Sequence, residues 1–128
     1  MRPPERAELL LRKAAHDEVL LDHVLSSPQV SDEIIGFHLQ QAAEKLLKAL
    51  LAAREVRYGR IHNLRALMDL LTDAGCPLPE RLQDLDALTP FGTLLRYEDV
   101  PSGAPIDRPR ARALVRELRR FVEEKLRR

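Results

Sequence analysis

Four histidines are the side chains of this chain best suited to acid–base or metal chemistry: His16, His23, His38 and His62. His16 and His23 are expected to be solvated, because both face away from the apolar stripe of the helix predicted around them. His38 lies at the edge of the next apolar face, where a packing role is expected. Two imidazoles without a third ligand do not define a zinc site, and no HExxH motif occurs. The sequence therefore predicts no metal site and no cofactor.

A polar face on the long helix predicted from 31 to 56 is the main candidate for a binding site. Three polar residues share this face at spacings i, i+4 and i+7. A histidine begins the next helix, and an Arg-Tyr pair follows later in the chain. Cationic side chains bind phosphate and a tyrosine ring stacks on a base. The candidate nucleotide site comprises Gln41, Lys45, Lys48, His62, Arg96 and Tyr97; the alternative is a solvated bundle face without a ligand.

Arg57 and His62, five positions apart, form a candidate catalytic pair of a cation and an imidazole. In such a site Arg57 would stabilise phosphate charge and His62 would transfer a proton. Both residues lie in the connection between two predicted helices. With 17 arginines and four histidines in the chain, a chance proximity of the two residues is the alternative.

Asp17 and Glu18 interrupt the apolar stripe of the first predicted helix. A carboxylate on a buried stripe needs a partner, because an isolated buried charge is unfavourable. The expected partners are Lys45, Lys48 or Arg96. Either a structural ion pair or a polar network at the base of a cleft would satisfy these carboxylates.

Helical periodicity runs through the whole chain, and no alternating strand pattern occurs. One stripe at 3.6-residue spacing predicts a helix from about Pro4 to Leu25. The next helix carries an apolar arc wide enough to contact two or more neighbours. Because the connections are short, neighbouring helices are expected to be antiparallel. The predicted fold is one all-α domain over residues 1–128, an up-and-down four-helix bundle with one or two extra short helices. The later helices are expected from His62 to Gly75, over 80–88, over 89–97 and from Asp107 onward.

Composition places the chain among globular proteins with 45% apolar and 32% charged residues in 128 positions. No apolar run approaches the ~20 residues of a membrane span. The N-terminal residues do not resemble a signal peptide, and the single Cys76 allows no internal disulfide. A cytoplasmic location without membrane contact is therefore expected. Residues 107–128 carry nine basic and four acidic side chains, so the last helix is either a solvated basic face or faces nucleotide or RNA.

The polar face lies within a longer pattern, GFHLQQAAEKLLKALL at residues 36–51. This segment closely resembles the signature helix of HEPN domains, the "higher eukaryotes and prokaryotes nucleotide-binding" domains. His62-Asn63-Leu64 matches the histidine that begins a leucine-rich helix in that family, and Arg96-Tyr97 lies where the family often has Arg-Tyr. The resemblance covers nearly the whole chain in length and helix order. It implies an all-α bundle that forms homodimers.

The resemblance also implies several roles. Many HEPN domains are metal-independent RNases, often toxins, which use a late Arg-x4-6-His motif. Others work with a minimal nucleotidyltransferase, bind nucleotides, or serve as interaction modules. No histidine follows His62 here, so that late motif is absent. Arg57 and His62 match its spacing as Arg-x4-His, but in an earlier connection than the family uses. The favoured hypothesis is a nucleotide- or RNA-binding module that works with a minimal nucleotidyltransferase in a toxin–antitoxin-like pair. An endoribonuclease toxin and a non-catalytic dimeric scaffold are the alternatives, so enzymatic activity is left open.

Overall fold

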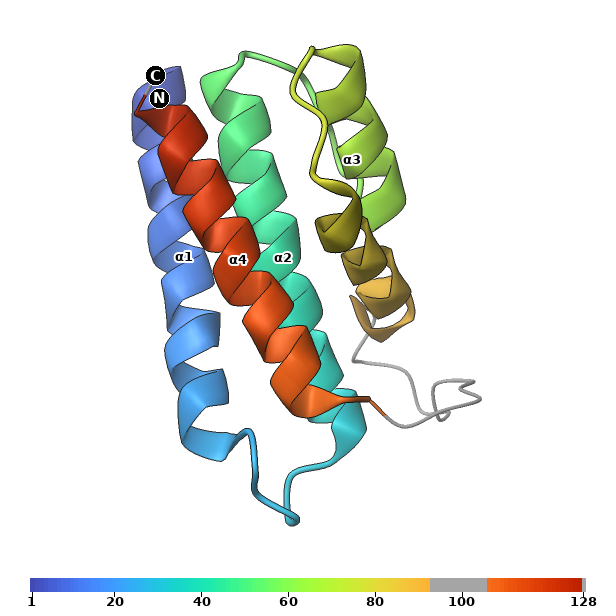
Figure 1. The fold of residues 1–128 in the computed structure, drawn as a ribbon. Coiled ribbons are helices and arrows are strands. Elements are labelled where there is room, and N and C mark those ends of the chain that lie inside the picture. The colour runs from blue at the N-terminus through green and yellow to red at the C-terminus, as the bar shows by residue number, and fades with distance from the viewer. Residues whose placement is uncertain (93–105, 128) are drawn as a thin grey trace.

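Helices form all the regular structure in the residues that this computed structural model describes, 1–92 and 106–127 (Figure 1). No strand occurs in that part of the chain. The all-α prediction is confirmed. The elements are α1 (Pro3–Val24), α2 (Asp32–Ala53), α3 (Leu64–Asp73), the 3₁₀ helix η1 (Glu80–Gly92) and α4 (Arg108–Leu126).

The helix ends follow local signals in the sequence. The Ser31 hydroxyl accepts a hydrogen bond from the Ile34 backbone N–H at 3.3 Å and caps α2. Asp107 caps α4 in the same way through the N–H of Arg110, at 3.1 Å. The helix α2 ends at Ala53, three residues before the predicted end, because the chain turns there.

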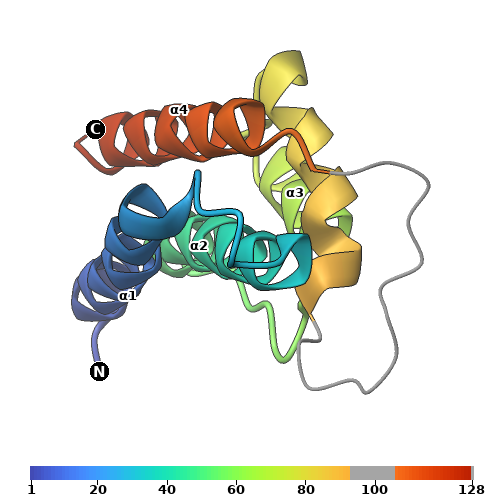
Figure 2. The same cartoon turned by 90° about the horizontal axis from the view of Figure 1, so that it is seen from below.

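The helix α2 is the centre of the bundle. In Figure 2, α4 lies over α1 and α2, while η1 and α3 lie on the other side of α2 from α1. The wide apolar arc of α2 is buried on all these neighbours, and Leu39, Leu46 and Leu50 have no exposed surface. Burying a leucine side chain stabilises the fold by about 2 kcal/mol. The prediction that this helix contacts several neighbours is confirmed.

The connection from α2 to α3 differs from the expected short link. It runs back along α2, because His62 contacts Gln40 and Glu44 rather than the end of the helix at Ala53. The nine residue steps from 44 to 53 correspond to about 14 Å of helix. As a result α3 runs in the same direction as α2 (Figure 1), and the expectation that these neighbours are antiparallel is wrong.

The segment after α3 also differs from the prediction. One 3₁₀ helix continues through Pro90 to Gly92, where two separate short helices over 80–88 and 89–97 were expected. The second of these extends into residues 93–97, outside the described residues. Near the end of η1, Phe91 packs on α2 at Gly36. A Cβ atom on Gly36 would lie 2.8 Å from Ile106 Cδ1 and even closer to Phe91, so only glycine allows this approach.

Candidate functional site

A buried carboxylate organises the polar face of α2. Glu44 is 6% exposed, and its two oxygens accept hydrogen bonds from three side chains. Gln40 Nε2 donates at 3.0 Å and Lys48 Nζ at 3.1 Å. His62 Nδ1 lies 3.1 Å and 3.2 Å from the two carboxylate oxygens. We call this group, with Gln41, the histidine network.

The i, i+4 spacing of residues 40, 44 and 48 places three members of the histidine network on one strip of α2. Gln40 is fully buried and its Nε2 also donates to the His62 backbone carbonyl at 3.1 Å. Its Oε1 accepts from Gln41 Nε2 at 2.8 Å. Within the described part of the chain, every buried side-chain N or O atom has a hydrogen-bond partner. A fully satisfied network of this kind holds its members in one arrangement.

His62 is the point at which the network reaches solvent, since its side chain is 67% exposed. Its Nδ1 faces Glu44, and no described residue binds its Nε2. A carboxylate on one ring nitrogen fixes the orientation of the imidazole and leaves the other nitrogen to exchange a proton or bind an anion. Nearby, Lys48 Nζ lies 5.2 Å from the centroid of the Tyr58 ring, whose hydroxyl accepts from Arg6.

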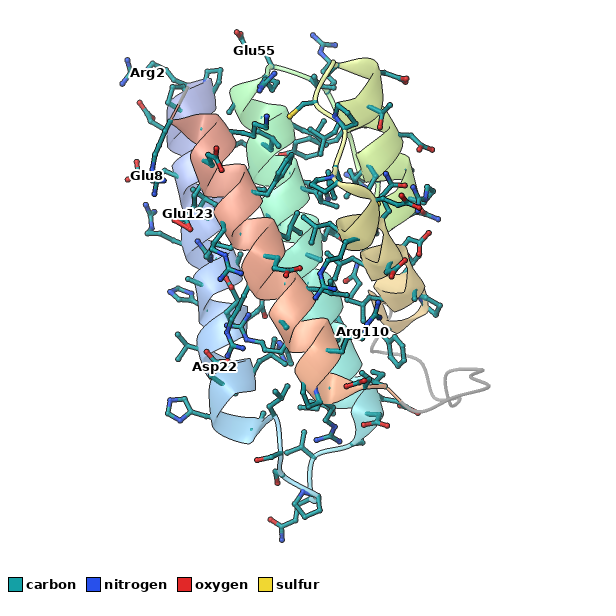
Figure 3. The ribbon with its side chains drawn as sticks, in the orientation of Figure 1. Arg2, Glu8, Asp22, Glu55, Arg110 and Glu123 are labelled. Atoms are coloured by element: carbon teal, nitrogen blue, oxygen red, sulfur yellow. The ribbon has the colours of Figure 1, made fainter. Side chains whose placement is uncertain are left out.

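A second charged group joins α1 to α4. The Arg112 guanidinium binds Asp22 with two hydrogen bonds, Nε to Oδ1 at 2.7 Å and an NH2 to Oδ2 at 3.1 Å. Arg119 donates to Glu18 at 2.8 Å, and Arg116 donates to Asp22 at 2.9 Å. Figure 3 shows Asp22 on α1, beside α4. We call these five residues the arginine network.

Charge pairing changes protonation in the arginine network. The hydrogen bond from Arg112 lowers the pKa of Asp22 below its ordinary value, although burial opposes this shift. Burial acts to lower the pKa of Arg112, but Asp22 and Glu18 outweigh it and the pKa is raised. Both members of the pair are therefore ionised at neutral pH.

The HEPN domain family model matches this chain over residues 7–128. The chain belongs to the HEPN domain family. Comparisons with curated proteins and with solved structures gave no match. At the family level, membership supports a module concerned with nucleotides or RNA.

This HEPN domain brings together three of the residues predicted for its nucleotide site. Gln41, Lys48 and His62 all belong to the histidine network. Lys45 does not, because its Nζ donates to Asp17 Oδ2 at 2.6 Å on the side of α1. Arg96 and Tyr97 lie outside the described residues.

Arg57 is exposed in the connection between α2 and α3, and it forms no hydrogen bond or ion pair with a described residue. His16 and His23 are exposed, as expected. His38, for which packing was expected, also has a polar contact: its Nδ1 lies 2.9 Å from Asp17 Oδ1.

The partner prediction for the α1 carboxylates is half correct. Asp17 pairs with Lys45, but Glu18 binds Arg112 and Arg119 of α4. Lys48 is engaged by Glu44 and is not available to either carboxylate. The arginines lie about a hundred positions away in the sequence, so helical spacing alone could not identify them.

Sequence reasoning missed Gln40 and Glu44 as site residues. The connection that returns along α2 buries both of them. The spacing of Glu44 and Lys48, opposite charges at i and i+4, is the signal that could have indicated a pair. Among the described residues, no group of three or more His, Cys, Asp or Glu is placed to hold a metal ion. None of the described helices is long and apolar enough to cross a lipid bilayer.

Proposed function

We propose that this HEPN domain binds nucleotide or RNA through the histidine network. The observation that carries the proposal is a buried, fully hydrogen-bonded set of polar side chains that ends in one exposed imidazole, His62. Buried polar groups stabilise a fold only weakly, so an open end on such a network favours a role in binding. Family membership supports the same ligand class.

His62 is the group that contacts phosphate in this proposal. With a proton on each ring nitrogen, the imidazole donates from Nδ1 to Glu44 and from Nε2 to a phosphate oxygen. Gln41 contributes amide hydrogen-bonding groups next to it, and Lys48 adds positive charge. Arg96 and Tyr97 belong to the proposed site on the sequence argument alone.

An endoribonuclease activity is the second candidate, and the Glu44–His62 contact favours it. A carboxylate–imidazole pair in which no described residue binds the second ring nitrogen is suited to proton transfer without a metal. Arg57 would stabilise phosphate charge in that reaction, as the Arg-x4-His pattern suggests.

Labelled RNA and single nucleotides, titrated against the protein in EDTA, test both functions. We expect saturable binding that His62→Ala weakens about tenfold, the loss of one charge-assisted hydrogen bond. His23→Ala is the matched control, because His23 is exposed on α1 and outside the network. Equal affinity of the His62→Ala variant and the wild type would remove the proposed site. Cleavage of the RNA by the wild type alone would establish the nuclease.

Partners are part of the proposal: a second copy of the chain and a minimal nucleotidyltransferase. Exposed apolar side chains on adjoining helices support the homodimer. Leu20 is 40% exposed on α1 and Ile34 38% exposed on α2. Each lies about one turn from the Asp17–His38 contact, so both belong to one face. Sedimentation of the wild type should give a dimer and Leu20→Glu a monomer. A dimer that binds no nucleotide or RNA would favour the scaffold alternative.

A further inference from the structure

A pocket of about 460 Å³ lies where the start of α1 meets the ends of α2 and α4. It shares no residue with the histidine network, so nothing in the proposed function accounts for it. Its size falls within the range of small-molecule sites, which is about 300 to 1,000 Å³. The pocket is large enough for a small molecule, and the residues that line it indicate the chemical class of that molecule.

The floor of the pocket is apolar. Ala7 on α1 and Ala53 on α2 carry only a methyl group, so their side chains leave the space between three helices open. Leu11 and Leu126 form half-buried walls. An apolar body of a ligand placed here would be removed from water, which favours binding by roughly 25 cal/mol per Å² of buried apolar surface.

Three charged side chains line the same pocket: Glu8, Arg54 and Lys125. None of them forms an ion pair with another described residue, whereas the arginines on the α1 side of α4 are paired with carboxylates. Lys125 Nζ has one close contact, the Phe121 ring with its centroid at 5.5 Å. The described lining therefore has two cations that form no ion pair with a described residue and one carboxylate, a positive balance.

Helix dipoles offer a separate reason for the two cations. Arg54 caps the C-terminus of α2 and Lys125 lies in the last turn of α4, where positive side chains interact favourably with the backbone carbonyls. That effect accounts for the sign of the charge. It does not account for an open apolar floor beside both side chains, so the two explanations make different predictions about ligands.

We propose that this pocket binds a small amphipathic anion, a compact anionic head on an apolar body. The head pairs with Arg54 and Lys125, and the body lies on Ala7, Ala53 and the two leucines. Glu8 repels a second negative charge, so a monoanion is preferred over a dianion.

Octanoate is the probe, titrated against the full chain by calorimetry at low salt, with octanol, octylamine and inorganic phosphate as comparison compounds. Octanoate should bind saturably at one site per chain. Octanol, which lacks the charge, and phosphate, which lacks the apolar body, should each bind at least about tenfold more weakly. Octanol binding as strong as octanoate binding would overturn the anionic part of the proposal. If octylamine bound more strongly than octanoate, the anionic part would be overturned as well, because the cation would then pair with Glu8.

Two variants locate the site. Arg54→Gln should weaken octanoate binding about tenfold, whereas Arg60→Gln, an exposed arginine outside the pocket, should leave it unchanged. Ala53→Leu fills the pocket and should abolish binding, provided that its unfolding transition matches the wild type. If Ala53→Leu fails to fold, Arg54→Gln decides the outcome alone. Absence of octanoate binding, or equal binding in Arg54→Gln and the wild type, would leave the cations with the helix-dipole role only.

Discussion

The arginine network and the histidine network use the same kinds of charged side chain and differ in how they end. In the arginine network, two carboxylates of α1 meet three guanidiniums of α4, and every group has a partner. In the histidine network, one carboxylate gathers Gln40, Lys48 and His62, and the imidazole keeps one ring nitrogen unbound by any described residue.

This difference indicates a division of roles. Arg112 binds Asp22 through two parallel hydrogen bonds and is 4% exposed, a geometry that fixes α4 against α1. His62 is two-thirds exposed and adds little packing. We therefore expect substitutions in the arginine network to act on stability and substitutions at His62 to act on binding.

The largest loss of stability is expected from Arg112→Ala. Its removal leaves Glu18 and Asp22 short of a counter-charge at the α1–α4 interface, which destabilises by about 3 kcal/mol. Urea unfolding measures this. Arg120→Ala, an exposed position on the same helix, should change the free energy of unfolding by less than about 0.5 kcal/mol. Similar losses in the two variants would contradict the structural role of the arginine network.

Glu44→Gln should lower the free energy of unfolding by less, about 2 kcal/mol. The side chain keeps its shape but leaves Lys48 buried without a counter-charge. The exposed Glu5→Gln is the control, since a surface ion pair contributes at most about 1 kcal/mol. Nitrogen NMR of the His62 ring should show that the preference for a proton on Nδ1 is lost in Glu44→Gln only. An unchanged ring spectrum would mean that Glu44 does not determine which ring nitrogen of His62 carries the proton.

Acid should weaken the arginine network through Asp22. Its folded pKa lies below the ordinary value, so its contribution is complete above the pKa of the unfolded chain, 3.8, and is lost as the pH falls through the folded pKa. Because the Asp22 side chain is 44% exposed, solvent limits the effect to less than about 1 kcal/mol. Urea unfolding of the wild type and Asp22→Asn at several pH values should converge below pH 3.8. If the difference in unfolding free energy between the wild type and Asp22→Asn did not change with pH, the stability would not depend on the protonation of Asp22.

The smallest effect on stability is expected from His62→Gln, below about 0.5 kcal/mol, because the ring is mostly exposed. Thermal unfolding checks this beside the binding assay. A loss as large as that of Glu44→Gln would mean that His62 serves to hold the connection on α2, and the contrast between the networks would fail.

Local signals in the sequence were sufficient to predict the four α-helices and several of their ends, but not the single 3₁₀ helix η1 or the exact end of α2. Helices were expected to begin at residue 31 and at Asp107, and Ser31 and Asp107 cap α2 and α4. Gly75, with φ +79°, follows the end of α3 as predicted. The apolar arc of α2 correctly indicated several neighbours. These features depend on residues within a few positions of each other, so periodicity and capping rules apply to them directly.

The site was predicted only in part, because its burial depends on tertiary contacts. Nothing near Gln40 in the sequence indicates that residues 54–63 return to cover it. Lys45 and Lys48 share a helix face, yet one pairs with α1 and the other with Glu44. A helical wheel gives the direction of a side chain but not the identity of what it meets.

Gly36 has opposite effects on the intrinsic helix stability of α2 and on its packing. Glycine lowers helix stability by about 1 kcal/mol relative to alanine in an isolated peptide. In the folded chain an alanine there would collide with Phe91 and Ile106, which reach α2 from η1 and from the residues before α4. The same substitution should therefore raise the helicity of a peptide spanning α2 and lower the stability of the protein. The residue at position 36 is thus determined by segments far along the chain and not by the helix that contains it.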